Sequence, residues 1–176
     1  MMRSTRGLNP CQEAERQIRM GKDKDNLRWE HINTSKGRGV FAKSHIFKGA
    51  FILQYRGILR KGYSGTNDYS YHFRHGGSHY CIDASSEDGS MGRLVNDDPK
   101  PNGKMKKMKV DGVPQLCIFA VKDIMEGQEI TYDYGGVDLP WRSSPGQEMA
   151  KGLHLGYEVS VWFSKNYSVT SQLGMT

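Results

Sequence analysis

Short β-type segments, each followed by a turn signal, occupy the middle of the chain and restrict the folds open to it. The predicted strands are Arg28–Asn33, Gly39–Ala42, Ala50–Tyr55, Tyr69–Arg74, His79–Asp83, Gln115–Val121 and Glu129–Tyr132. The glycine pair Gly76-Gly77 between two of them predicts a hairpin. Such a series is typical of a mostly β fold of folded-over, largely antiparallel sheets rather than βαβ units. No internal repeat is apparent.

One helix is predicted before the first strand. Asn9 is a suitable N-cap, Pro10 suits the first helical turn, and Gly21 is suited to end a helix over Cys11–Met20. Its thin apolar edge consists of Ala14 and Ile18, which lie one turn apart. The predicted organisation is a charged flank with this short helix over residues 1–26, the main β domain over 27–136, and a C-terminal flank and tail over 137–176.

Composition excludes several classes of protein. The 176 residues contain no apolar run long enough to span a bilayer, and the first residues lack the apolar core of a secretory signal. The three cysteines are too far apart for a disulfide scaffold or a zinc cluster, so we expect reduced thiols in an intracellular protein without a metal site. We expect no membrane association and a monomer.

The net charge of +6 favours polyanionic partners, although a small excess also serves solubility. Lysines are concentrated between Lys100 and Lys109, a stretch without an acidic residue. Pro101 and Gly103 indicate a loop, so this segment is interpreted as a basic finger. Nucleosomal DNA is the candidate partner of these lysines, and a loop that only maintains solubility is the alternative.

Four separated segments carry residues suited to chemistry. They are Lys36–Ala42, Tyr69–Tyr71, Gly92–Asn96 and Glu129–Gly135. Each has an ordinary explanation by itself: a G-x-G pair is usually a turn, and alternating aromatic residues are usually one face of a strand. Their order and content together are more specific than any one of them.

Taken together, these segments resemble the SET-domain lysine methyltransferases, and the resemblance is closest to the branch that monomethylates lysine 20 of histone H4. It extends from about Glu13 to Arg142 and includes further matching segments, namely Ile18–Lys22, Tyr55–Gly57, Tyr80–Ala84, Asp111–Pro114 and Asp123–Glu129. The resemblance implies a SET-domain fold with a C-terminal pseudoknot and a protein-lysine N-methyltransferase of the nucleus and chromosome. The implied partner is a histone tail or another lysine-containing protein, with histone H4 as the expected substrate.

The implied cofactor is S-adenosyl-L-methionine. By resemblance, its binding residues are Lys36, Arg38, Gly39, Tyr80, Asn96, Asp97 and Trp141. Glycines allow the backbone to approach the methionine portion of the cofactor closely. The indole of Trp141 is a candidate to stack on the adenine, and simple coverage of apolar surface is the alternative.

The implied catalytic residues are tyrosines. Carried over position by position, Tyr134 is the essential tyrosine beside the transferring methyl group and Tyr132 limits how many methyl groups fit. Tyr55 and Tyr69 line the lysine channel. Phenols suit this task because they orient an amine without adding negative charge, their own pKa being about 10.

One residue departs from the family pattern. Asp97 follows Asn96 where the family has histidine, and a shorter, anionic side chain there would attract the sulfonium or displace Tyr134. Three functions therefore stay open: an active methyltransferase, a catalytically weakened SET module that binds histone or nucleosome, and a basic β-barrel that binds nucleic acid.

Overall fold

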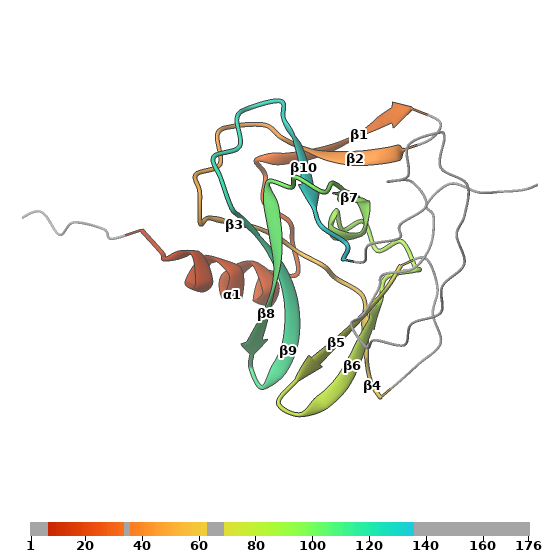
Figure 1. The fold of residues 1–176 in the computed structure, drawn as a ribbon. Coiled ribbons are helices and arrows are strands. Elements are labelled where there is room, and N and C mark those ends of the chain that lie inside the picture. The colour runs from red at the N-terminus through yellow and green to blue at the C-terminus, as the bar shows by residue number, and fades with distance from the viewer. Residues whose placement is uncertain (1–6, 34–35, 63–68, 136–176) are drawn as a thin grey trace, which may run out of the picture.

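The chain folds as a set of short strands preceded by one helix. The computed structural model describes residues 7–33, 36–62 and 69–135 (Figure 1). In chain order its elements are α1 (Pro10–Met20), β1 (Leu27–Asn33), β2 (Gly37–Ala42), β3 (Phe51–Gln54), β4 (Ile58–Lys61), β5 (Ser70–His75), β6 (Ser78–Asp83), the 3-10 turn η1 (Gly92–Leu94), β7 (Asn96–Asp97), β8 (Gly103–Val110), β9 (Val113–Ala120) and β10 (Glu129–Tyr132). The prediction of a mostly β fold with a short N-terminal helix is confirmed.

The strands form two sheets. The larger has the order β1-β2-β10-β8-β9-β3, with β7 added beside β10, and the smaller has the order β4-β6-β5. Most neighbours are antiparallel, but β7 runs parallel to β10, with Asn96 opposite Thr131 and Asp97 opposite Tyr132. This parallel pairing places β7 beside β10, and the expected pseudoknot joins the same two segments of the chain.

Two hairpins have the turn chemistry of type I′. Gly76 and Gly77 both have positive φ angles of 55° and 78°, and they connect β5 to β6 as predicted. Asp111 and Gly112, with φ angles of 49° and 83°, connect β8 to β9 in the same way. The backbone twist of such turns matches the right-handed twist of the flanking strands.

The interpretation of the lysine-rich segment as a loop is wrong. Residues Gly103–Val110 form strand β8, which pairs with β9 along its full length. Met105 and Met108 pack against buried clusters, while the lysines between them are exposed. The lysine content hid the strand, because only two partly buried methionines interrupt the run of exposed lysines.

Helix α1 forms and docks as its sequence predicts. The Asn9 side chain accepts a hydrogen bond from the backbone of Gln12, the Gln12 side chain accepts one from Asn9, and Gly21 ends the helix with φ 62°. Ala14 is completely buried against Phe51 and its neighbours in β9, next to the half-buried Ile18. Among the described residues, no helix has the length and apolar character needed to cross a membrane.

An internal repeat connects the two halves of the larger sheet, contrary to the expectation from sequence. The pattern F-A-x-x-x-I-x-x-G occurs at Phe41–Gly49 and again at Phe119–Gly127. The two copies bind each other reciprocally, because the amides of Ile46 and Ile124 each donate to the other's carbonyl, at 2.8 and 2.9 Å. Likewise, each terminal glycine donates to the alanine carbonyl of the other copy at 2.8 Å.

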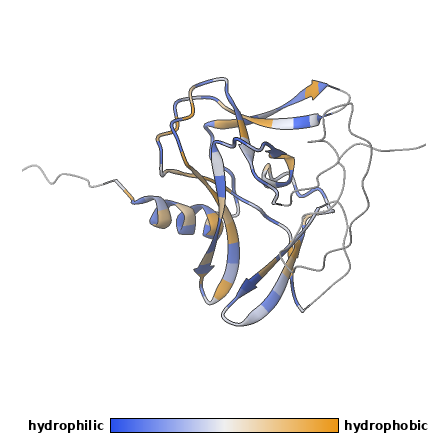
Figure 2. Ribbon diagram, viewed as in Figure 1, coloured by the Kyte–Doolittle hydropathy of each residue, from blue (hydrophilic) through white to orange (hydrophobic). Residues whose placement is uncertain are grey.

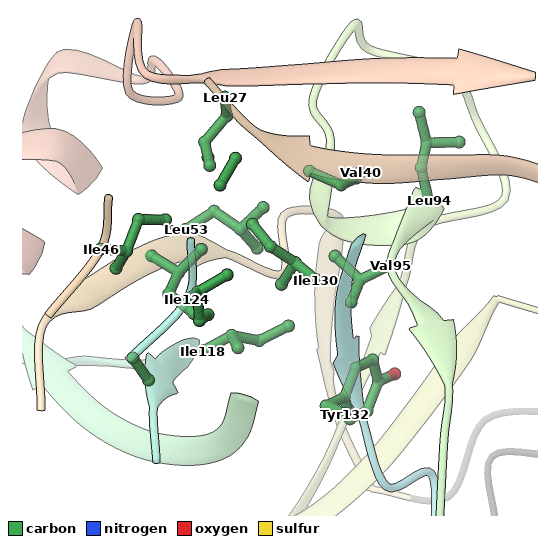
Figure 3. Packing of buried hydrophobic residues seen from close by; sticks show 13 residues of the cluster. Leu27, Val40, Ile46, Leu53, Leu94, Val95, Ile118, Ile124, Ile130 and Tyr132 are labelled. Atoms are coloured by element: carbon green, nitrogen blue, oxygen red, sulfur yellow. The ribbon is translucent and has the colours of Figure 1, made fainter. Parts of the chain in front are cut away.

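The main core lies between these copies and the strands that carry them. Aliphatic side chains from β2, β3, β9 and β10 meet there, and Tyr132 closes the cluster with its hydroxyl directed away from the apolar groups (Figure 3). Hydrophobic and hydrophilic positions alternate along α1 and several strands, as expected for elements with one buried face (Figure 2). The smaller sheet packs a second cluster containing Tyr55, Phe73 and Leu116.

The buried position of Ala14 generates a stability prediction. Replacing Ala14 with Leu forces extra volume into the contact with Phe51 and Phe119, so we expect the free energy of unfolding to fall by about 1–3 kcal/mol. Urea denaturation followed by circular dichroism measures it. The matched control is Arg16→Leu on the exposed face of the same helix, which should change stability little. Equal midpoints for both variants would contradict this docking of α1.

Candidate active site

The candidate site lies where η1, β7 and the end of β10 meet. Gly92 begins η1 and packs directly on the backbone of Gln54 and Tyr55, where a Cβ atom would collide with the Gln54 carbonyl oxygen. This close approach brings the segment after η1 against the end of β3. The parallel pairing of β7 with β10 then places Asn96 and Asp97 beside the tyrosines that follow.

The four tyrosines predicted to form the channel are brought together. The rings of Tyr132 and Tyr134 lie 4.7 Å apart, and the Tyr55 hydroxyl donates to the Tyr69 carbonyl at 2.9 Å. A fifth tyrosine, Tyr71 on β5, lies 5.9 Å from the Tyr55 ring. From the sequence, Tyr71 was expected only on a strand face, although its alternation with Tyr69 was a usable signal.

Burial keeps these phenols neutral. Desolvation raises the pKa of Tyr132, Tyr134 and Tyr55, and the neighbouring phenols raise it further for each of them. The pKa of Tyr71 is also raised, first by burial and then by the Asp133 carboxylate. The cluster therefore presents hydroxyl groups without negative charge at neutral pH.

Tyr134 is held at both ends by one short segment. Its hydroxyl donates to the Val95 carbonyl at 2.7 Å, and its backbone amide donates to Asp97 Oδ1 at 2.9 Å. Asp97 therefore does not displace Tyr134, which was one of the two consequences expected from its departure from the family pattern. The Asp97 carboxylate also contributes to the raised pKa of Tyr134 and Tyr132.

Asn96 connects the site to β2 and β10. Its amide nitrogen donates to the Arg38 carbonyl at 3.1 Å and to Glu129 Oε1 at 2.8 Å. Gly39 leaves room for these contacts, since a Cβ there would lie 2.9 Å from that carboxylate oxygen and 3.1 Å from the amide. Glu129 also forms an ion pair with Lys36 at 3.5 Å. From the sequence, Glu129 was apparent only as part of a motif.

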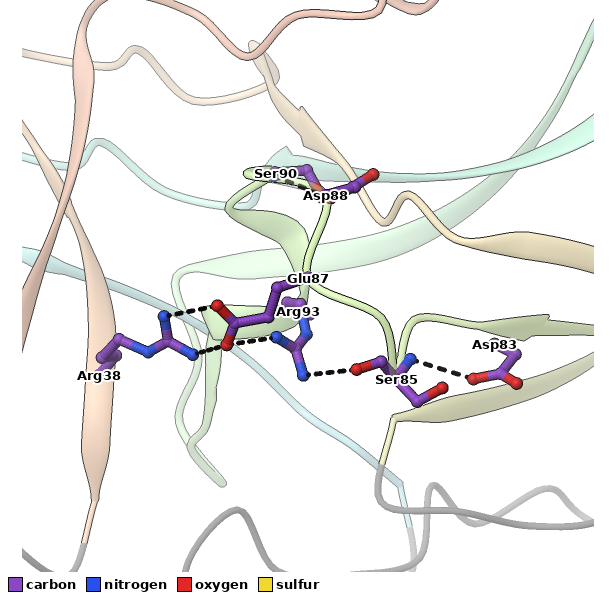
Figure 4. A network of polar contacts seen from close by, with 7 residues as sticks. All are labelled: Arg38, Asp83, Ser85, Glu87, Asp88, Ser90 and Arg93. Carbon is purple, nitrogen blue, oxygen red and sulfur yellow. Dashed lines mark hydrogen bonds and ion pairs between the residues drawn. The ribbon is translucent and has the colours of Figure 1, made fainter.

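A chain of charged groups joins Arg38, Glu87 and Arg93 (Figure 4), and Arg93 extends it to the tyrosines. The Glu87 carboxylate contacts both Arg38 and Arg93, the latter at 2.7 Å, and Arg38 lowers the pKa of Glu87. Arg93 is almost fully buried, donates to the Ser85 carbonyl at 3.2 Å, and lies over the Tyr69 ring at 3.9 Å. Only the Gly-Arg-Leu motif in the sequence hinted at Arg93, and Glu87 carried no signal.

The segment before β1 also supports the site. Asp23 is buried, and its Oδ2 atom accepts a hydrogen bond from the backbone of Met91, directly before η1, at 2.7 Å. Desolvation raises the pKa of Asp23, although the Met91 amide and Arg56 oppose that shift. The N-terminal segment thus contacts the turn that leads into β7.

Two further residues, Tyr80 and Trp141, were also predicted to bind the cofactor. Tyr80 lies on β6 and stacks on Phe73 with ring centroids 5.7 Å apart, within the cluster of the smaller sheet. Trp141 and the predicted tail lie outside the described residues. Within the described ranges, no three His, Cys, Asp or Glu side chains gather in an arrangement able to hold a metal ion.

The residues present fit a cationic methyl donor. Two carboxylates, Asp97 and Glu129, lie beside neutral phenols, and they suit a ligand carrying a sulfonium and an ammonium group. Lys36 and Arg38 add cations suited to a carboxylate, and Gly39 keeps the backbone of β2 free of a side chain. These charged groups therefore suit a ligand that carries both cationic groups and a carboxylate.

Comparison with protein families agrees with the fold. The SET domain model matches residues 37–135, which include β2, the whole tyrosine cluster and β10. The chain belongs to the SET-domain family.

Similar proteins are lysine methyltransferases. The N-lysine methyltransferase KMT5A-A of Xenopus laevis is 38% identical over 117 residues, covering 60% of this chain and 35% of the relative. The histone-lysine N-methyltransferase set-1 of Caenorhabditis elegans is 36% identical over 113 residues, covering 57% and 47%. The alignments thus span less than half the length of these relatives.

Solved structures show the same fold. CpSET8 from Cryptosporidium superposes with a TM-score of 0.54 at 29% identity, covering 64% of this chain and 58% of that one. The methyltransferase domain of human histone-lysine N-methyltransferase SETMAR gives a TM-score of 0.56 at 27% identity, covering 67% and 47%. The SET-domain fold predicted from the sequence is confirmed.

The raised phenol pKa values predict the response of the fold to alkali. An unfolded tyrosine ionises near pH 10 whereas buried Tyr132 stays protonated, so stability is fully present below pH 10 and falls above it. Each such phenol contributes a loss of about 1.4 kcal/mol per pH unit. In urea denaturation between pH 8 and 11, Tyr132→Phe should lose stability more slowly than the parent chain. Identical slopes would contradict the burial of this phenol.

Proposed function

We propose that the protein transfers a methyl group from S-adenosylmethionine to the ε-amino group of a protein lysine. The observation that carries this proposal is the cluster of neutral, buried tyrosines at the junction of β7 and β10. Membership of the SET-domain family and similarity to proteins named as lysine methyltransferases support it.

The chemistry requires a neutral amine. A free lysine has a pKa of about 10.4, so deprotonating it near pH 7 costs roughly 4–5 kcal/mol. A channel of buried aromatic rings disfavours the ammonium form and lowers that cost, and the buried Arg93 guanidinium behind Tyr69 acts in the same direction. When bound, the cofactor supplies an electrophilic methyl group on a sulfonium, which becomes a neutral thioether when the methyl group leaves.

Each tyrosine has a proposed role. Tyr134, whose hydroxyl is oriented by the Val95 carbonyl, lies beside the transferring methyl group. Tyr132 limits the number of methyl groups that fit on the nitrogen. Tyr55 and Tyr69 line the channel, and we add Tyr71 because its ring contacts Tyr55.

The proposed cofactor residues lie on or directly before β2 and β7. Lys36, Arg38, Gly39 and Asn96 form one connected group, and the Asp97 carboxylate lies beside it next to Tyr134. Tyr80 and Trp141 remain predictions based on the family resemblance alone.

The proposed substrate is histone H4 in chromatin, so the protein would act in the nucleus, on the chromosome. We expect it to act as a monomer. The alternative is a weakened module that binds histone or nucleosome without turnover, for which the Asp97 substitution is the argument. The two hydrogen bonds that hold Tyr134 favour the active enzyme over this alternative.

Removing single hydroxyls tests the proposed roles. Tyr134→Phe should abolish methyl transfer while costing about 1 kcal/mol of stability, because it removes one buried hydrogen bond to Val95. Tyr132→Phe should keep activity and let the lysine accept more methyl groups. Mass spectrometry of histone H4 and of reconstituted nucleosomes after incubation with the cofactor reads out both effects. Full turnover by Tyr134→Phe would disprove its assignment.

Nucleosomal DNA is proposed to contact β8. The register with β9 places Lys104 and Lys106 on the face that carries Phe119, where Lys106 lies 4.8 Å over the ring. Lys107 and Lys109 point to the opposite face, where the Lys107 ammonium donates to the Arg74 carbonyl at 3.2 Å. Each ammonium group would act as a point charge on a phosphate.

The two faces differ in the charge around them. Near α1, Asp111 and Glu15 pair with Arg19 and add negative charge beside the face that carries Lys104 and Lys106. On the opposite face the Lys107 ammonium contacts the backbone carbonyl of Arg74, a residue that is itself exposed and cationic. The face formed by Lys107, Lys109 and Arg74 is therefore the better phosphate surface.

Paired lysine substitutions separate the faces. Changing Lys107 and Lys109 to Gln should reduce methylation of nucleosomes much more than that of a free H4 peptide. It should also flatten the log–log salt dependence of nucleosome binding by about 0.9 for each phosphate that the variant no longer neutralises. The same change at Lys104 and Lys106 is the matched control and should have less effect. If both double variants treat nucleosome and peptide alike, the lysines serve solubility only.

A further inference from the structure

We propose that Asp97 is the positioning residue of Tyr134, and that its carboxylate makes the site prefer the positively charged cofactor over its neutral thioether product. This inference rests on the proposed methyltransferase function. It assigns to Asp97 a role that replaces that of the family histidine and interprets the substitution as an adaptation rather than as decay.

The positioning role follows from the geometry. The segment Val95–Asp97 holds Tyr134 at two points, through the Val95 carbonyl on the hydroxyl and Asp97 Oδ1 on the backbone amide. In the parallel ladder between β7 and β10, Asp97 of the same segment also pairs with Tyr132. The phenol and the backbone of Tyr134 are therefore both held by one short strand, so its hydroxyl has little freedom to turn away.

The preference for the cofactor follows from charge. A histidine in this place would be neutral or positive near neutral pH, whereas the aspartate contributes a carboxylate, whose Oδ1 atom accepts the Tyr134 backbone amide. The surrounding rings of Tyr132 and Tyr55 are buried and that of Tyr134 is partly buried, so water screens this charge less than it would at an exposed site. A carboxylate in such surroundings attracts a sulfonium and has no comparable attraction for a neutral thioether.

The two contributions can be separated by substitution. Asp97→Asn keeps an oxygen that accepts the Tyr134 amide but removes the charge, whereas Asp97→Ala removes both. Asp98→Asn is the matched control, because it removes a neighbouring carboxylate whose Oδ1 accepts the Lys100 amide in the next turn instead of a tyrosine amide.

Calorimetric binding of S-adenosylmethionine and S-adenosylhomocysteine measures the charge effect without requiring turnover. The parent chain and Asp98→Asn should prefer the charged ligand, and in Asp97→Asn that preference should fall by about tenfold. An unchanged ratio of the two dissociation constants in Asp97→Asn would overturn the electrostatic part of the proposal.

Methyl transfer to an H4 peptide measures the positioning effect. Asp97→Ala should lose about 10²-fold in turnover, as expected for a misplaced catalytic group, and Asp97→Asn should recover most of that loss. Equal rates for Asp97→Ala and the parent chain, or a faster Asp97→His variant, would overturn the positioning role. If Asp97→Ala does not fold, Asp97→Asn alone tests the positioning role, and its turnover must then stay within about tenfold of that of the parent chain.

The outcomes also separate this inference from the function on which it rests. A parent chain that binds neither ligand contradicts the proposed methyltransferase and the role of Asp97 together. Suppose that the parent chain binds the cofactor and methylates lysine, and that the Asp97 variants bind and react in the same way. That result contradicts only the role of Asp97.

Discussion

The parallel pairing of β7 with β10 is the contact on which the candidate site depends. Asn96 and Asp97 lie opposite Thr131 and Tyr132, so residues distant in the chain share one ladder. Short strands contribute few hydrogen bonds, and side chains complete the junction: Asn96 binds the Arg38 carbonyl, and Asp97 binds the Tyr134 amide. A substitution that separates these strands would therefore separate the proposed cofactor residues from the tyrosines.

The electrostatics of the site follow from burial. Because desolvation keeps the phenols of Tyr132 and Tyr134 neutral, charge in this region comes from a few groups with defined partners. Arg93 is placed over the Tyr69 ring and held by Glu87, and Asp97 is held by a backbone amide. A fixed cation beside Tyr69 and a fixed anion beside Tyr134 suit the proposed reaction, which needs a neutral amine and a cationic donor.

Much of the fold could be predicted from local signals, since caps and turns act over a few residues. Asn9 and Gly21 bound the helix, and Gly76-Gly77 forces a type I′ turn. Strand β8 was missed because its lysines obscure its two partly buried methionines, and β4 because its residues are mostly exposed. The tyrosines were found through family resemblance, whereas the contacts of Arg93, Glu129 and Asp97 depend on tertiary structure that no local pattern encodes.

The internal repeat explains how so small a core holds the site. The copies at Phe41–Gly49 and Phe119–Gly127 begin with the last two residues of β2 and β9, and they bind each other through reciprocal backbone hydrogen bonds. Strand β10, which begins just after the second copy, pairs with β2 at Val40 and Phe41, where the first copy begins. The repeat thus closes one end of the sheet, and the other end of β2 and β10 is free to carry Arg38 and Tyr134. The hydrogen bonds at the closed end position the strand that precedes Tyr134. The Val95–Asp97 segment then needs only to orient Tyr134 itself.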